Sequence, residues 1–123
     1  TMWIALGVSN KKNGALYYYR GSHKSGLQKH LPSFVPGSSK TVKVGKKIKK
    51  FKKITPELNK GDVLLHDNLI IHGSTKNRSK IERVGLTLRF IQKKGRIDIK
   101  KKRKYERELF KQIKLRDNNN ARI

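Results

Sequence analysis

His72 and Arg83 are the residues of this chain whose side chains and spacing most favour chemistry, and they lie eleven positions apart. An imidazole is a common protein ligand of iron, zinc and copper. A guanidinium is the side chain best shaped to bind a carboxylate through two parallel hydrogen bonds. Together the two residues indicate a metal site next to a binding site for a carboxylate. Taken alone, the same pair also fits a structural histidine at a strand end and an ordinary arginine.

The elements that must hold these side chains are short strands within the stretch from Gly61 to Phe90. Val63 to Leu65 predicts a strand, which Asp67-Asn68 interrupts. Leu69 to Ile71 predicts a second strand, because its residues favour extended backbone, and this strand would end at His72.

From Arg83 the sequence alternates between two kinds of residue, which predicts a strand with one apolar face. The apolar face would carry Val84, Leu86, Leu88 and Phe90, and the other face Arg83, Gly85, Thr87 and Arg89. Two neighbouring strands would then hold the imidazole and the guanidinium close together, facing the same space. A metal ligand beside a carboxylate clamp is what a non-haem iron oxygenase that uses 2-oxoglutarate requires.

Four segments of the chain resemble, in order, the C-terminal half of the phytanoyl-CoA dioxygenase family of iron(II)/2-oxoglutarate oxygenases. They are TMWIAL (Thr1 to Leu6), NGALYYYRGSHK (Asn13 to Lys24), GDVLLHDNLIIHGSTKNRS (Gly61 to Ser79) and ERVGLTLRF (Glu82 to Phe90). The histidine-glycine-serine motif followed by arginine is the most specific part.

The resemblance implies roles for four residues. His72 would be the last of three iron ligands and Arg83 would bind 2-oxoglutarate, while Ser74 and Trp3 would line the co-substrate pocket. The implied function is oxidative hydroxylation of a small organic substrate, with iron(II), 2-oxoglutarate and O2. The implied fold is mainly β, as part of a double-stranded β-helix (jelly roll), to which the sequence adds a C-terminal helix.

The chain departs from the family at the metal site. The family takes its first two iron ligands from a His-x-Asp motif upstream of the tryptophan strand. Here only two residues precede Trp3, and none of His23, His30 and His66 is followed two positions later by aspartate. We therefore interpret the chain as the C-terminal part of a longer protein and expect this chain alone to be inactive. A degenerate relative that has lost the metal site is the alternative. His66 is interpreted as strand packing rather than as a donor to a metal ligand.

The formal net charge is +24, which ordinarily indicates a partner such as nucleic acid or an anionic membrane. The cations are 23 lysines and 9 arginines, however, and base recognition favours arginine. Compositional bias is therefore preferred, and a basic module that binds nucleic acid or another polyanion stays as the alternative. The lysine-rich runs Thr41 to Lys53 and Lys100 to Lys104 would either neutralise phosphates or form a solvated face.

An Asn13-Gly14 turn predicts a hairpin between strands at Met2 to Leu6 and Ala15 to Arg20. Alternation in the second strand places Tyr17 and Tyr19 on one face and Tyr18 on the other. Strand packing is the preferred interpretation of these rings, with a stacking surface for bases or a substrate as the alternative.

The chain is predicted to divide into the jelly-roll portion, residues 1–92, and a basic C-terminal extension, residues 93–123. Apolar residues at four-residue steps predict a helix from Lys102 to Leu115 in the extension. Residues 21–40 are predicted to form a loop rich in glycine, serine and proline. The sequence contains no cysteine and no apolar run long enough to cross a membrane, so a cytoplasmic location is expected.

Overall fold

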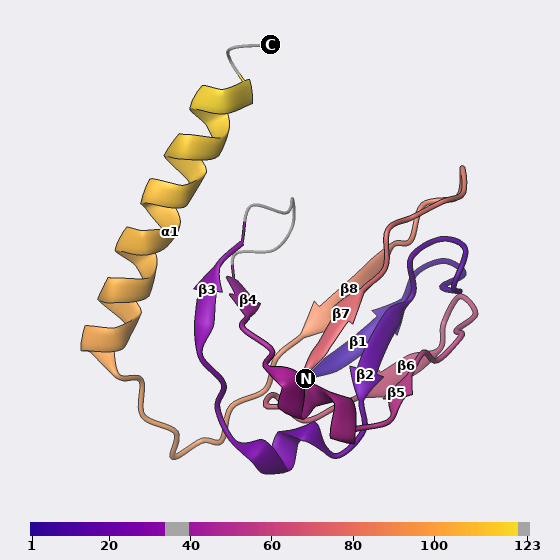
Figure 1. Ribbon diagram of the computed structural model, residues 1–123, viewed down its shortest axis with the longest axis horizontal. Helices are drawn as coiled ribbons and strands as arrows, with labels where there is room; N and C mark the ends of the chain where they lie inside the picture. Colours follow the sequence, from indigo (N-terminus) through magenta and orange to yellow (C-terminus); the bar gives the residue numbers. More distant parts are fainter. Residues whose placement is uncertain (34–39, 121–123) are drawn as a thin grey trace. The chain divides into compact units, whose positions relative to one another are not determined.

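The computed structural model is mainly β with one long helix near its C-terminus, and it describes residues 1–33 and 40–120 (Figure 1). The elements are β1 (Met2–Ala5), β2 (Leu16–Tyr19), η1 (Ser22–Ser25), β3 (His30–Pro32), β4 (Lys40–Val42), η2 (Lys46–Lys50), β5 (Lys53–Ile54), β6 (Val63–Leu65), β7 (His72–Ser74), β8 (Gly85–Leu88) and α1 (Ile99–Asn120). Two compact units divide the chain, one formed by residues 1–28 and 44–90 and the other by residues 29–43 and 91–123. The predicted mainly β class with a C-terminal helix is confirmed.

The first sheet of the larger unit has the strand order β6-β1-β8, with both pairs antiparallel. Trp3 lies opposite Leu64 on β6 and Thr87 on β8. Since side chains alternate along a strand, these three share a face, on which Trp3 and Ala5 are buried. The other face is apolar and carries Met2, Ile4, Val63, Leu65, Leu86 and Leu88. The predicted separation of Leu86 and Leu88 from Gly85 and Thr87 is therefore confirmed.

The second sheet has the strand order β5-β2-β7, again with antiparallel pairs. Tyr18 lies opposite His72 on β7 and Ile54 on β5. The rings of Tyr17 and Tyr19 meet edge to face, with centroids 5.8 Å apart, while Tyr18 is buried. The predicted separation of the three tyrosines between two faces of the strand therefore agrees with the structure.

The predicted hairpin between the first two strands is wrong, because β1 and β2 belong to different sheets. Both edges of β1 are occupied by β6 and β8, so β2 pairs elsewhere. The turn before β2 is held by its own side chains instead of by a strand ladder. Asn13 donates from Nδ2 to the Val8 carbonyl at 2.7 Å, and its Oδ1 accepts from the Asn10 N–H at 2.8 Å.

The strand predicted at Leu69 to Ile71 is also wrong, since His72 begins β7 instead of ending a strand. The backbone before His72 uses side chains as partners. Asp67 Oδ1 accepts from the Leu69 N–H at 2.7 Å, and Ser22 Oγ accepts from the Ile71 N–H at 2.8 Å. These bonds compete with a ladder and turn the chain before the strand starts.

The smaller unit combines the antiparallel pair β3-β4 with α1, which contacts β3. Asp98 caps the helix, because its Oδ1 accepts from the Lys101 N–H at 3.0 Å. Lys40 on β4 forms an ion pair with Glu108 on the helix. Longer than predicted, the helix runs from Ile99 to Asn120. Within the described residues, no helix combines the length and apolar character that a membrane crossing needs.

The loop predicted at residues 21–40 is only partly correct. It contains the short helix η1 and the strand β3, and β4 begins at its last residue. The part of this prediction that concerns residues 34–39 lies outside the described residues.

Gly85→Ala is expected to lower the free energy of unfolding by about 1–3 kcal/mol through overpacking. A Cβ atom at Gly85 would lie 2.1 Å from Cζ2 of the buried Trp3 ring. Gly45→Ala is the control, because a Cβ atom there meets nothing within 4 Å. Urea denaturation followed by tryptophan fluorescence measures both variants. Equal midpoints for the two variants would contradict the close packing of Trp3 on β8.

Candidate functional site

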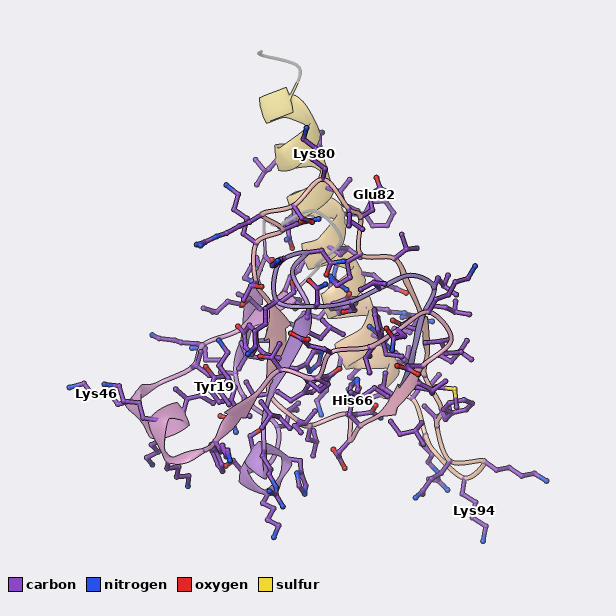
Figure 2. All side chains as sticks on the ribbon, turned by 90° about the vertical axis from the view of Figure 1, so that its right-hand side faces the viewer. Tyr19, Lys46, His66, Lys80, Glu82 and Lys94 are labelled. Atoms are coloured by element: carbon purple, nitrogen blue, oxygen red, sulfur yellow. The ribbon has the colours of Figure 1, made fainter. Side chains whose placement is uncertain are left out.

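Three aromatic side chains from the two sheets meet inside the larger unit. His72 begins β7, His66 directly follows β6, and Tyr18 lies in β2. The ring of Tyr18 stacks on His72 at 5.7 Å with an interplanar angle of 25°, and it lies 5.2 Å from the His66 ring. The two imidazoles are 5.1 Å apart between centroids. His66 is labelled in Figure 2. The ring contacts of His66 agree with its interpretation as a packing residue.

The hydrogen bonds of the two imidazoles decide which nitrogen can bind a metal. His72 donates from Nδ1–H to the Ile70 carbonyl at 2.9 Å, since a carbonyl oxygen only accepts. His66 likewise donates from Nδ1–H to the Asp67 carbonyl at 3.0 Å. In the neutral ring Nε2 then keeps its lone pair, and a backbone carbonyl on Nδ1–H is a common arrangement in metal-binding histidines. His72 is thus in the tautomer that a ligand needs.

Arg83 reaches the same interior from the first sheet. It precedes β8 and is half-buried, with its guanidinium 5.8 Å from the centroid of the Trp3 ring. The flat cation over an indole face is a favourable cation–π contact. Gly85 allows this arrangement, because the Trp3 ring occupies the space that a side chain at position 85 would fill.

Tyr18 connects the imidazole and the guanidinium. Burial raises the pKa of its phenol to about 12, and the positive charge of Arg83 opposes that rise. The prediction that adjacent strands bring His72 and Arg83 together is therefore wrong in detail, because β7 and β8 lie in different sheets. Both residues instead act on Tyr18, one through ring stacking and the other through its charge.

Burial also lowers the pKa of His66, and this is the largest influence on that group. The hydrogen bond to the Asp67 carbonyl favours the protonated ring and opposes the shift, while the neighbouring His72 adds to it. The neutral form of His66 is therefore favoured at neutral pH, which suits an imidazole enclosed by two other rings.

The remaining predicted site residues, Trp3 and Ser74, occupy different surroundings. Trp3 is buried beneath Arg83 and forms a wall of the interior. Ser74 is two residues after His72, on the same face of β7, and is exposed. Tyr18 was not among the predicted site residues, because alternation gave its face but not its neighbours. Its place between two flanking tyrosines on the opposite face was the available signal.

The described residues do not form a complete iron site. Among them, no group of three histidine, cysteine, aspartate or glutamate side chains is arranged to hold a metal ion. His72 supplies one imidazole with the correct tautomer, and a two-histidine, one-carboxylate centre needs two further ligands. The residues present therefore fit a single position on the metal.

The lysine-rich runs are mostly exposed surface. The lysines of η2 point into solvent, and the side chains of Lys46 and Lys80 extend away from the ribbon in Figure 2. Some lysines have structural contacts, since Lys53 lies 3.9 Å from the centroid of the Tyr17 ring and Lys40 pairs with Glu108. A dispersed cationic surface of this kind attracts polyanions without reading their sequence.

Comparison with known proteins places most of this site within one family. The family model described as Phytanoyl-CoA dioxygenase (PhyH) matches residues 1–85, a range that includes Trp3, Tyr18, His72 and Arg83. Phytanoyl-CoA dioxygenase 1 of Oryza sativa subsp. japonica is 30% identical over 99 residues, covering 76% of this chain and 33% of the relative.

A second relative gives a similar match. The phytanoyl-CoA dioxygenase domain-containing protein 1 homolog of Dictyostelium discoideum is 32% identical over 96 residues, covering 74% of this chain and 34% of the relative. The chain thus spans about a third of the length of the curated relatives that it matches. No solved structure matches significantly.

This chain, purified alone, is expected to retain no stoichiometric iron(II) after desalting, because one imidazole leaves most of the metal coordination to water. Iron content per chain, measured by atomic absorption, tests this expectation, with His30→Ala and His72→Ala as paired variants. Stoichiometric iron that is kept by His30→Ala and lost by His72→Ala would show that the site is complete, against the prediction.

DNA binding by this chain is expected to be weak, indifferent to sequence and strongly dependent on salt, because lysine contacts mainly release counterions. Filter binding of two unrelated duplexes at several salt concentrations measures both properties. Tight binding at physiological salt with preference for one duplex would favour a nucleic-acid-binding module instead.

Proposed function

The chain belongs to the phytanoyl-CoA dioxygenase family, and on that premise we propose that it forms the C-terminal part of an iron(II)- and 2-oxoglutarate-dependent dioxygenase that hydroxylates a small organic substrate. In this proposal His72 is one of the iron ligands and Arg83 binds the carboxylate of 2-oxoglutarate. Trp3 and Ser74 line the co-substrate pocket.

One observation carries the proposal most strongly. Tyr18, from one sheet, stacks on His72 and is influenced by the charge of Arg83, which lies over Trp3 of the other sheet. A metal-ligating tautomer and a carboxylate-binding cation therefore share one interior. A purely structural histidine and a surface arginine would have no reason to converge there.

Arg83 is suited to hold a carboxylate in a fixed orientation. Its guanidinium offers a planar fork that matches the two carboxylate oxygens, and the Trp3 ring restricts the plane of that fork. Half-burial removes part of the competing water, which strengthens a charged hydrogen bond. The residue thus combines charge, geometry and a partly dry setting.

His72 contributes a single nitrogen, Nε2, oriented by the bond from Nδ1–H to the Ile70 carbonyl. A bound iron(II) ion supplies the redox chemistry, which the side chains of this chain cannot supply. The proposal therefore requires a second histidine and a carboxylate from a segment outside this sequence, in the His-x-Asp pattern of the family. A relative that has lost this pattern would keep the sheets and lack turnover.

Arg83→Lys is expected to raise the KM for 2-oxoglutarate by roughly thirtyfold or more in a polypeptide that joins this chain to a His-x-Asp segment. Lysine keeps the charge and loses the two-pronged geometry, and weakening a buried charge pair typically costs ~2–5 kcal/mol. Succinate formation measures turnover.

Arg89→Lys is the matched control for this measurement. Arg89 is exposed and lies six residues further along, about 20 Å at ~3.3 Å per residue. It is expected to keep a near-normal KM. A crippled Arg89→Lys beside a normal Arg83→Lys would overturn the assignment of the clamp, and absence of succinate from the parent would overturn the dioxygenase proposal.

A further inference from the structure

The Tyr18 hydroxyl is a buried polar group with an unusual lack of partners. The residue is 3% exposed, and its hydroxyl oxygen has no hydrogen-bond partner among the described residues. Leaving such a group unsatisfied typically destabilises a protein appreciably, so an isolated case in the interior calls for an explanation. Phenylalanine would pack on His72 equally well without that cost.

The position of Tyr18 shows what the hydroxyl can reach. Strand alternation separates Tyr18 from Tyr17 and Tyr19, whose rings contact each other on the opposite face. On its own face Tyr18 helps to line a small hollow with Leu16 of the same strand and Leu64 of β6. The hydroxyl therefore belongs to the interior between the two sheets.

The groups around Tyr18 favour an anionic acceptor. The imidazoles of His66 and His72 flank the ring, and the positive charge of Arg83 acts on the phenol. Both ring Nδ1–H groups already donate to backbone carbonyls. An O–H group beside a cation lacks an acceptor here, and a carboxylate drawn to Arg83 would supply one.

We propose that the Tyr18 hydroxyl donates a hydrogen bond to the carboxylate that Arg83 binds. A carboxylate offers about four lone-pair positions, of which a two-pronged guanidinium occupies two, so a third donor is chemically compatible. The inference rests on the proposed function, since the carboxylate is that of 2-oxoglutarate. Tyr18 then selects an oxo acid by hydrogen bonding, whereas Trp3 and Leu64 contribute apolar walls.

Tyr18→Phe tests the proposal, with Tyr19→Phe as the matched control. Each change removes one hydroxyl from the same strand, but Tyr19 belongs to the opposite face. Binding of 2-oxoglutarate is measured calorimetrically in the polypeptide used for Arg83, with zinc in place of iron so that turnover does not interfere. Tyr18→Phe is expected to weaken the affinity about ten- to a hundredfold, as for loss of a hydrogen bond to a charged group. Tyr19→Phe is expected to bind like the parent.

A second measurement separates a ligand-binding role from a structural one. Without 2-oxoglutarate, the urea midpoint of Tyr18→Phe is expected to equal or exceed that of the parent, because the change removes an unsatisfied buried group. A clearly lower midpoint would mean that the hydroxyl has a structural partner, and it would overturn the proposal.

The binding experiment also distinguishes failure of this proposal from failure of the proposed function. If Arg83→Lys weakens binding and Tyr18→Phe equals Tyr19→Phe, the dioxygenase proposal stands and the role of Tyr18 is overturned. If the parent binds no 2-oxoglutarate, both are overturned. Weakening in Tyr18→Phe and Arg83→Lys, with Tyr19→Phe unaffected, supports both.

Discussion

The close approach of the Trp3 ring to the backbone of Gly85 is the constraint on which the interior of the larger unit depends. The ring occupies the space of the missing side chain, so β1 and β8 can pair while a large aromatic group lies between them. Arg83 rests over the same ring. An indole held in this way fixes the plane of the guanidinium, because a cation–π contact favours one face of the ring. A single glycine therefore connects strand pairing with the geometry of the anion-binding residue.

The second sheet brings its own chemistry to this interior through one register. Tyr18 lies opposite His72 on paired strands, and their rings stack. Gly73, the next residue, faces the other way and is covered by Tyr17. This alternation separates the polar interior, with its imidazoles and buried phenol, from a surface where Lys53 lies over the Tyr17 ring. The large positive charge of the chain is thus largely kept on the outside.

The sequence alone was sufficient for the class of fold and for the faces of the strands. Alternation separated Leu86 from Thr87 and Tyr18 from its neighbours, because side chains alternate in every extended strand whatever its partner. The periodicity of Tyr105, Leu109 and Ile113 likewise indicated the C-terminal helix. The roles of His72 and Arg83 followed from a resemblance, and the match to the family over residues 1–85 supports that resemblance.

Only the tertiary structure decided which strands are partners and which side chains meet. An Asn-Gly turn permits a hairpin but does not require one, and β1 had already used both edges on β6 and β8. The start of β7 was set by Ser22, far away in the sequence, which accepts a hydrogen bond from Ile71. The contact of Tyr18 with His66 and His72 depends on two sheets facing each other. Local sequence fixes the direction of a side chain along its strand, whereas its neighbours depend on long-range pairing that no local pattern encodes.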